Sequence, residues 1–201
     1  MGHFRKERLE LFSDGVFAIL LTLLVLDLKV PEQLGAAGLR AAAPGLLVHA
    51  GAFFVIGTAW ISHHQFLEHV ERVSTAMLGA NLLVLFWITL VPYGARIAAE
   101  RPHDGLGAAI MTASLTLSMA SLLLMFSFGQ FQSIVHDPVM VPFRKRRLRM
   151  FLTYVALGLL TTALCFESPW FGFVFLTYGI TAFWTPPASV VHERLTAANR
   201  G

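Results

Sequence analysis

The stretch from Arg8 to Leu28 constrains this chain most, because it is an apolar helix long enough to cross a bilayer. Its first turns nevertheless carry Ser13 and Asp14 close to Arg8. A charged side chain in or at the edge of a membrane span is costly and is retained where it has a partner or a function. The stretch therefore predicts a membrane helix that makes a buried polar contact or borders an ion pathway.

The composition of the whole chain also indicates a membrane protein. Of its 201 residues, 56% are hydrophobic and 13% are charged, whereas a soluble domain typically has about 25% charged residues. Lipid has to cover this excess of apolar surface, and a bilayer span needs about 20 apolar residues. Six such runs occur, at 8–29, 45–67, 75–95, 106–129, 148–166 and 169–189. They predict an all-α membrane protein with six transmembrane helices in one domain, residues 1–201, and short loops that include the small-residue segment 35–44.

The basic residues predict the topology, since Lys and Arg stay in cytoplasmic loops. With the N-terminus inside, 11 of the 15 Lys and Arg residues fall on the inner side, so both termini are expected in the cytoplasm. We interpret the basic run at 144–149 as a loop that touches anionic lipid, and not as a nucleic-acid site. A signal peptide with a cleavage site near 41–44 is an alternative for the first run, but five further spans already need an inserted protein.

Two other functions have to be weighed against a channel. The eight histidines suggest a haem or metal protein, but His63 and His64 are adjacent and point in different directions, and no His-Glu-x-x-His motif is present. We therefore expect no metal site and no cofactor. A secondary transporter is the other alternative, although such folds show inverted repeats and broken helices and neither is visible here. The single cysteine, Cys165, excludes an intrachain disulfide and is expected to pack as a small apolar side chain.

Helical geometry separates two faces on the first helix. Each residue turns the helix by about 100°, so Ile19, Leu23 and Leu26 form one stripe with Thr22 at its edge. Asp14 lies about 140° from Ile19, points into the helix bundle and needs a hydrogen-bond donor there. Periodicity alone leaves open whether the stripe faces a pore, a neighbouring helix or lipid.

The candidate donors to Asp14 lie at a similar depth on three helices. They are Arg8, His63 or His64, and Asn81. A buried carboxylate with such partners forms a rigid polar clamp, and fixing the helices to one another is the preferred interpretation. At the other end of the first helix, Asp27 lies about 80° from the stripe, as is typical of a solvated helix end.

One motif on the first helix and several later polar positions carry a family resemblance. They are Arg8, Phe12, Ser13 and Asp14, followed by GVFAI, and then Trp60, His63, His64 and Asn81. These residues resemble the signature of the endosomal/lysosomal potassium channel family and its bacterial homologues. The six-span length is similar to the bacterial branch, so the resemblance covers essentially the whole chain.

The resemblance implies a potassium channel, not an enzyme, that assembles as a homotetramer in a bacterial plasma membrane. The first helices would line a central pore, with Ile19, Leu23 and Leu26 as apolar constriction rings and Thr22 supplying a hydroxyl nearby. A narrow apolar ring gates by dewetting, and it penalises Na⁺ more than K⁺ because Na⁺ holds its water more tightly. Copies of Asp27 around the axis would concentrate K⁺ and other monovalent cations at the outer mouth.

Overall fold

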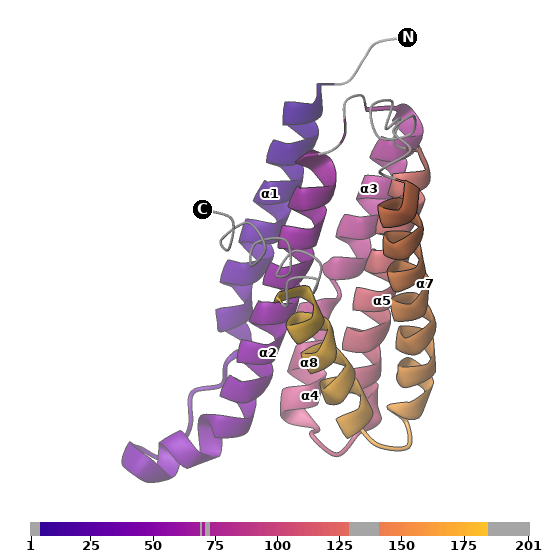
Figure 1. Cartoon of the computed structure of the whole chain (residues 1–201). Coiled ribbons are helices and arrows are strands. Elements are labelled where there is room, and N and C mark those ends of the chain that lie inside the picture. Colours follow the sequence, from indigo (N-terminus) through magenta and orange to yellow (C-terminus); the bar gives the residue numbers. More distant parts are fainter. Residues whose placement is uncertain (1–4, 69, 71–72, 129–140, 185–201) are drawn as a thin grey trace, which may run out of the picture.

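The computed structural model describes residues 5–184 apart from 69, 71–72 and 129–140, and only the backbone of 141–147, 150 and 180–184. Within these ranges every element is a helix (Figure 1), so the prediction of an all-α protein is confirmed. The elements are α1 (Lys6–Leu23), the short 3₁₀ helix η1 (Leu24–Asp27), α2 (Gly35–Glu68), α3 (Thr75–Ile88), α4 (Val91–Glu100), α5 (Gly105–Phe128), α7 (Val141–Leu164) and α8 (Trp170–Trp184).

Four of the described segments are long and apolar enough to cross a membrane. They are Lys6–Asp27, Gly35–Glu68, Thr75–Glu100 and Gly105–Phe128. The predicted fifth and sixth spans correspond to α7 and α8, whose described apolar parts, Phe151–Leu164 and Trp170–Gly179, are shorter. The described residues therefore show a membrane protein with four membrane-length segments. The end of the sixth predicted span and the inner basic side chains at 72, 144–147, 194 and 200 lie outside the part described.

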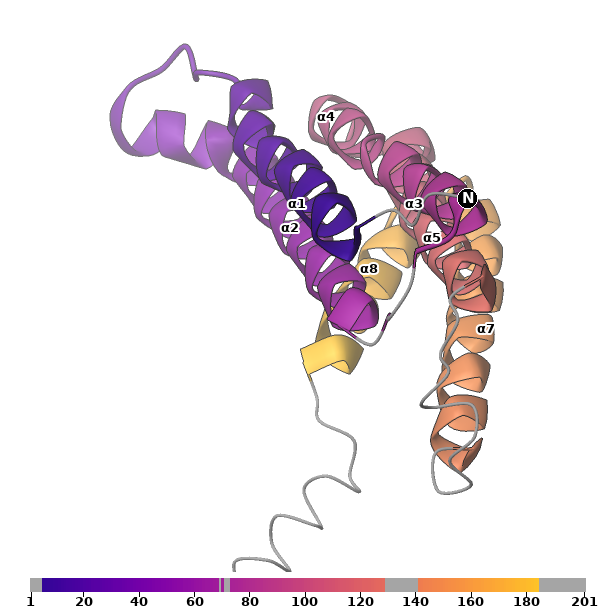
Figure 2. The same ribbon diagram turned by 90° about the horizontal axis from the view of Figure 1, so that it is seen from above.

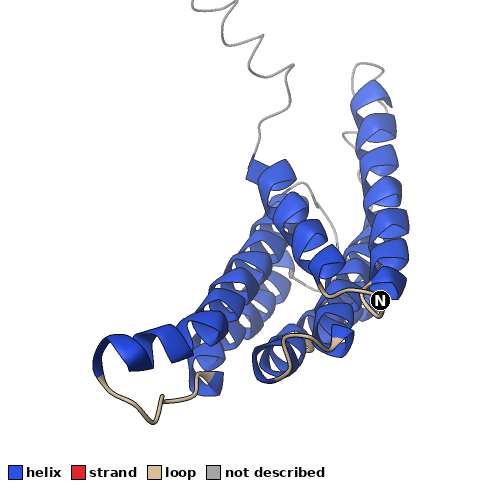
Figure 3. Ribbon diagram, turned by 90° about the horizontal axis from the view of Figure 1, so that it is seen from below, coloured by secondary structure: helices blue, strands red, loops and turns tan. Residues whose placement is uncertain are grey.

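Helix α2 begins ten residues before the predicted span, because segment 35–44 forms its first turns. The prediction of a loop there is wrong, since the segment is rich in alanine, the strongest helix former. Pro44 lies inside the helix, where a proline removes one backbone hydrogen bond and bends the axis. The first turns of α2 accordingly turn away from the rest of the helix (Figures 1 and 3).

The predicted third span is divided into α3 and α4. Ser74 begins α3, since its hydroxyl accepts a hydrogen bond from the backbone N–H of Met77 at 3.2 Å. Pro92 has no N–H and cannot donate to the carbonyl of Ile88 four residues earlier. Helix α3 therefore ends, and α4 starts with this proline in its first turn. The two helices together still form one membrane-length segment.

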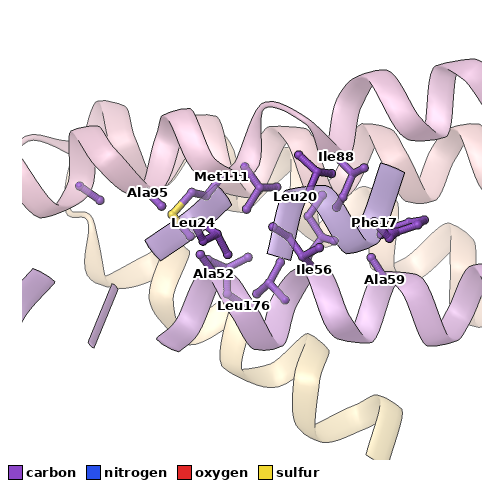
Figure 4. Packing of buried hydrophobic residues seen from close by; sticks show 14 of the residues in the cluster. Phe17, Leu20, Leu24, Ala52, Ile56, Ala59, Ile88, Ala95, Met111 and Leu176 are labelled. Carbon is purple, nitrogen blue, oxygen red and sulfur yellow. The ribbon is translucent and has the colours of Figure 1, made fainter. Parts of the chain in front are cut away.

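The helices form two groups with the core between them. Seen from above, α1 and α2 run together on one side and α3, α4, α5 and α7 lie on the other (Figure 2), while α8 contacts α2, α5 and α7. Phe17 and Leu20 of α1 and Ile56 of α2 are buried in the same cluster as Ile88 and Met111 from the opposite group (Figure 4). Buried residues make up 61% of the most apolar part of α5 but only 28% of that of α1. Helix α5 is thus the centre of the bundle, and α1 keeps most of its apolar surface at the periphery.

Helices α4 and α5 approach closely at two glycines. A Cβ atom at Gly94 would lie 2.8 Å from Cγ of Met111, and a Cβ atom at Gly107 would collide with the backbone of Ala98. Small residues allow such close approach of helices in lipid, where dispersion contacts drive packing. This contact holds α4 firmly against the central helix.

Candidate functional site

Three buried polar side chains from α1, α2 and α3 meet inside the bundle. The amide Nδ2 of Asn81 donates to Oγ of Ser13 at 3.1 Å, and its Oδ1 lies 2.7 Å from Nε2 of His63. Ser13, His63 and Asn81 are each at most 1% exposed. Because an unpaired polar group in apolar surroundings is costly, these contacts specify how the three helices pack against one another.

The carboxylate of Asp14 has a different partner from its neighbour Ser13. The indole Nε1 of Trp60 donates to Oδ1 of Asp14 at 2.8 Å. The Trp60 ring stacks on His64 with 5.8 Å between ring centroids, and Nε2 of His64 lies 3.5 Å from a carboxylate oxygen of Glu68. A second polar chain therefore connects α1 to the last turns of α2.

The donor to Asp14 is thus none of the expected ones. Of these, Arg8 and His64 are exposed, whereas His63 and Asn81 belong to the buried group around Ser13; Phe12 of the motif is also exposed. Ser13 and Asp14 are adjacent, so they point about 100° apart and meet different neighbours. Trp60 and His64 are four residues apart on one face of α2, and this spacing is the sequence signal for the missed partner.

The stripe of Ile19, Leu23 and Leu26 lies on the surface of the described chain. These side chains are 58%, 49% and 75% exposed, whereas Leu20 and Leu24 are buried. The Thr22 hydroxyl is exposed and donates to the carbonyls of Ala18 and Ile19 of its own helix at 3.1 and 2.9 Å. The stripe is therefore an apolar face that the rest of the described subunit does not cover.

Asp27 belongs to a network of four charged residues at the end of η1. Nη1 of Arg96 lies 3.7 Å from Oδ1 of Asp27, and its Nε lies 3.5 Å from Oε1 of Glu100. Nζ of Lys29 lies 3.1 Å from the same oxygen of Glu100. The carboxylate of Asp27 is thus compensated in the subunit. The i, i+4 spacing of Arg96 and Glu100 is the sequence signal for this network.

Cys165 and the histidines that the structure describes are not arranged as a metal site. Cys165 is buried and packs with Ala108 and Ala109, which confirms its expected apolar environment. Among the residues that the structure describes, no group of three or more His, Cys, Asp or Glu side chains is arranged to hold a metal ion. The arrangement is therefore an apolar helix face fixed at one end by polar contacts and at the other by ion pairs.

Known proteins share both the first-helix motif and the fold. The family described as the endosomal/lysosomal potassium channel TMEM175 matches residues 8–92. A potassium channel of Streptomyces collinus is 40% identical over 123 residues, which are 59% of this chain and 60% of that protein. The mouse endosomal/lysosomal proton channel TMEM175 is 35% identical over 116 residues, 50% of this chain and 23% of that protein. The chain thus matches less than two thirds of the length of either relative.

The structural similarity extends over nearly the whole chain. The crystal structure of a lysosomal potassium-selective channel TMEM175 homologue from Chamaesiphon minutus has a TM-score of 0.72 and 26% sequence identity. The match covers 90% of this chain and 98% of that one. The matched proteins are ion channels and not enzymes. Over residues 8–92 the chain is similar to the family of the endosomal/lysosomal potassium channel TMEM175, and its fold is similar to that of a TMEM175 homologue over nearly the whole chain.

Proposed function

We propose that this chain is the subunit of a potassium-selective cation channel in which the α1 helices of a homotetramer line a central pore. The observation that carries the proposal is the uncovered apolar stripe of Ile19 and Leu23 on α1 and Leu26 on η1. Symmetric copies of α1 around an axis would cover this face with one another. The names of the Streptomyces and Chamaesiphon proteins support potassium as the permeant ion.

In this proposal the subunit is one six-helix transmembrane domain, residues 1–201, with both termini in the cytoplasm of a bacterial cell. Helices α7 and α8 would serve as the fifth and sixth spans, together with residues beyond those described. The extensive overlap with the Chamaesiphon channel supports this arrangement. Conduction of K⁺ needs no bound cofactor, only the pore and the bilayer around it.

The mechanism follows from the apolar side chains. Rings of Ile19, Leu23 and Leu26 would exclude water when the helices are close together and admit it when α1 moves outward, so the pore gates by dewetting. An ion has to lose part of its hydration shell to pass, which costs more for Na⁺ than for K⁺. The Thr22 hydroxyl already donates to its own helix, but its oxygen can still accept from water or contact a cation.

The contacts of Ser13 and Asp14 would hold the N-terminal half of α1 in place, while the C-terminal half moves and the more exposed ion pair of Asp27 with Arg96 opens. Ser13 and Asp14 attach the N-terminal half to α3 and α2, whereas the proposed rings lie in the C-terminal half. Asp27 would attract cations at the outer mouth only when its ion pair with Arg96 opens, because the two charges together are neutral. The polar contacts are thus anchors, and the stripe is the conducting surface.

The proposal is tested by reversal potentials of the purified protein in liposomes, with K⁺, Na⁺ and H⁺ gradients applied in turn. We expect K⁺ permeation above Na⁺, and Ile19→Asn should weaken this discrimination or raise the leak. Leu82→Ala is a matched control for Ile19→Ala, because Leu82 of α3 is 56% exposed and Ile19 is 58% exposed. An unchanged reversal potential and current in both Ile19 variants would contradict the proposed constriction.

Protons are the second candidate ion, because the mouse relative is named a proton channel. The same liposomes distinguish the two ions. A current that follows the H⁺ gradient and is unaffected by replacing K⁺ would assign proton conduction instead. A saturable flux that requires a coupled ion gradient would assign a transporter.

A further inference from the structure

A cavity opens beside the charged network at the Asp27 end of the bundle. Its volume is about 380 Å³, and it lies between η1, the first turns of α2 and α4. Cavities of roughly 300–1,000 Å³ are typical of small-molecule sites. None of the side chains proposed above to form the constriction lines it.

The cavity lies at the level where membrane-length segments end. The segment Lys6–Asp27 has 22 residues, about 33 Å of helix at 1.5 Å per residue, which matches a hydrocarbon core of about 30 Å. The segment Thr75–Glu100 ends at the same network. Since Asp27 and Glu100 both lie at span ends, the charged side of the cavity is at the height of the lipid headgroups.

The walls of the cavity are apolar on one side and carry one unpaired polar atom. Leu24, Leu46 and Val48 contribute the apolar surface. His49 also lines the cavity, and its Nδ1 is buried without a hydrogen-bond partner.

The charged rim of the cavity has as many basic side chains as acidic ones. Lys29 and Arg96 lie beside Asp27 and Glu100, and all four residues line the cavity. An anionic headgroup would meet two carboxylates, and a cationic one would meet two basic side chains. A zwitterion satisfies both pairs, because its phosphate faces the basic groups and its ammonium faces the carboxylates.

We propose that this cavity binds a phosphatidylethanolamine molecule of the surrounding leaflet. The phosphate contacts Arg96 and Lys29, the primary ammonium donates to Asp27 and Glu100, and an acyl chain lies along Leu24 and the apolar wall. Phosphatidylcholine has the same charges but no N–H donors on its quaternary ammonium, so it binds more weakly. The lipid thereby joins the end of η1 to α2 and α4.

The test is native mass spectrometry of the purified, delipidated full chain titrated with dioleoyl phosphatidylethanolamine, phosphatidylcholine and phosphatidylglycerol. We expect phosphatidylethanolamine to bind about tenfold more tightly than the other two, as the charge-assisted hydrogen bonds of its ammonium imply. Arg96→Gln should weaken the retention of all three lipids, because it removes a contact to the phosphate that they share. Arg40→Gln is the matched control, because Arg40 lies in the first turns of α2, bonds the carbonyl of Ala36 in its own helix and does not line the cavity.

A second variant leaves every charge in place. Ala99→Phe adds a ring at a residue that lines the cavity and should abolish lipid retention, so it decides the question if Arg96→Gln does not fold. Equal retention of the three lipids, a preference for phosphatidylglycerol, or full retention by Ala99→Phe would overturn the proposal. No retention by the folded protein would do so as well and would indicate that another subunit fills the cavity. Retention is measured without ion flux, so this result is independent of the proposed channel activity.

Discussion

The contact between Ser13 and Asn81 gives a quantitative prediction about how α1 is held. Ser13→Ala removes the hydroxyl that accepts from Nδ2 of Asn81 at 3.1 Å. Asn81→Leu removes the amide and also leaves Nε2 of His63 without its partner at 2.7 Å. Because all three side chains are buried, water cannot replace the lost partner.

The expected magnitudes differ between the single variants. Hydrogen bonds between membrane helices average about 0.6 kcal/mol and reach about 1.7 kcal/mol, so Ser13→Ala should lower the free energy of unfolding by roughly 0.5–1.5 kcal/mol. Asn81→Leu should cost about 1–3 kcal/mol, because it leaves a buried donor unsatisfied. The double variant should cost less than the sum, with a coupling energy of about 0.6–1.7 kcal/mol.

The assay is reversible unfolding of the purified protein in mixed micelles, analysed as a double-mutant cycle. Ser121→Ala is the matched control, because the Ser121 hydroxyl bonds the carbonyl of Leu117 in its own helix at 2.8 Å. It should be additive with Asn81→Leu. A coupling energy below about 0.3 kcal/mol for Ser13 and Asn81, within the range of ordinary additivity, would refute the role assigned to this contact.

Three further variants test other parts of the account. Trp60→Phe keeps an aromatic ring but removes the donor to Asp14, so unfolding in mixed micelles should become easier by about 1.5–3 kcal/mol; a change below about 0.3 kcal/mol would contradict this contact. Gly107→Leu should lower the melting temperature in detergent strongly, because a Cβ there meets Ala98, whereas Gly51→Leu has nothing within 4 Å and should not; equal melting temperatures would contradict the close approach of α4 and α5. Thr22→Val should leave the melting temperature unchanged, because the hydroxyl donates only to carbonyls of its own helix. A large drop would contradict this and would indicate that the hydroxyl bonds another subunit.

The fold class and the shared face of the stripe residues followed from residue pattern alone. The surface of a long apolar run has to be covered by lipid or by other apolar helices. The membrane helix at α1 was therefore predictable. The 3.6-residue repeat placed Ile19 and Leu23 on one face, and both are exposed in the structure. What that face contacts depends on other subunits, which no pattern within one chain specifies.

The partners inside the subunit were less predictable. Whether Asp14 meets Trp60 or His63 depends on how far α2 is rotated about its axis, and a rotation of about 60° exchanges them. The pairing of Asp27 with Arg96 depends on the break before α4. Pro92 lies inside the predicted span 75–95, and the apolar pattern did not show that a new helix carrying Arg96 starts there.

The helix boundaries failed for identifiable reasons. Segment 35–44 consists mostly of small residues, which led to the prediction of a loop, yet its alanines favour a helix. Helix α7 begins at Val141 and includes the basic run 144–149, so it starts seven residues before the predicted span. Hydropathy finds apolar surface, and it does not find where a helix starts or stops.

The central claim is that the stripe on α1 faces the pore, and thiol accessibility tests it most directly. In a Cys165→Ala background, Ile19→Cys and the equally exposed Leu82→Cys are reconstituted in liposomes and treated with Cd²⁺ or a charged methanethiosulfonate reagent during K⁺ flux. Block of Ile19→Cys alone is the predicted result, because symmetric thiols around a pore axis lie in the path of the ion. Equal block of both variants, or continued flux through a fully modified Ile19→Cys channel, would contradict a pore lined by this face of α1.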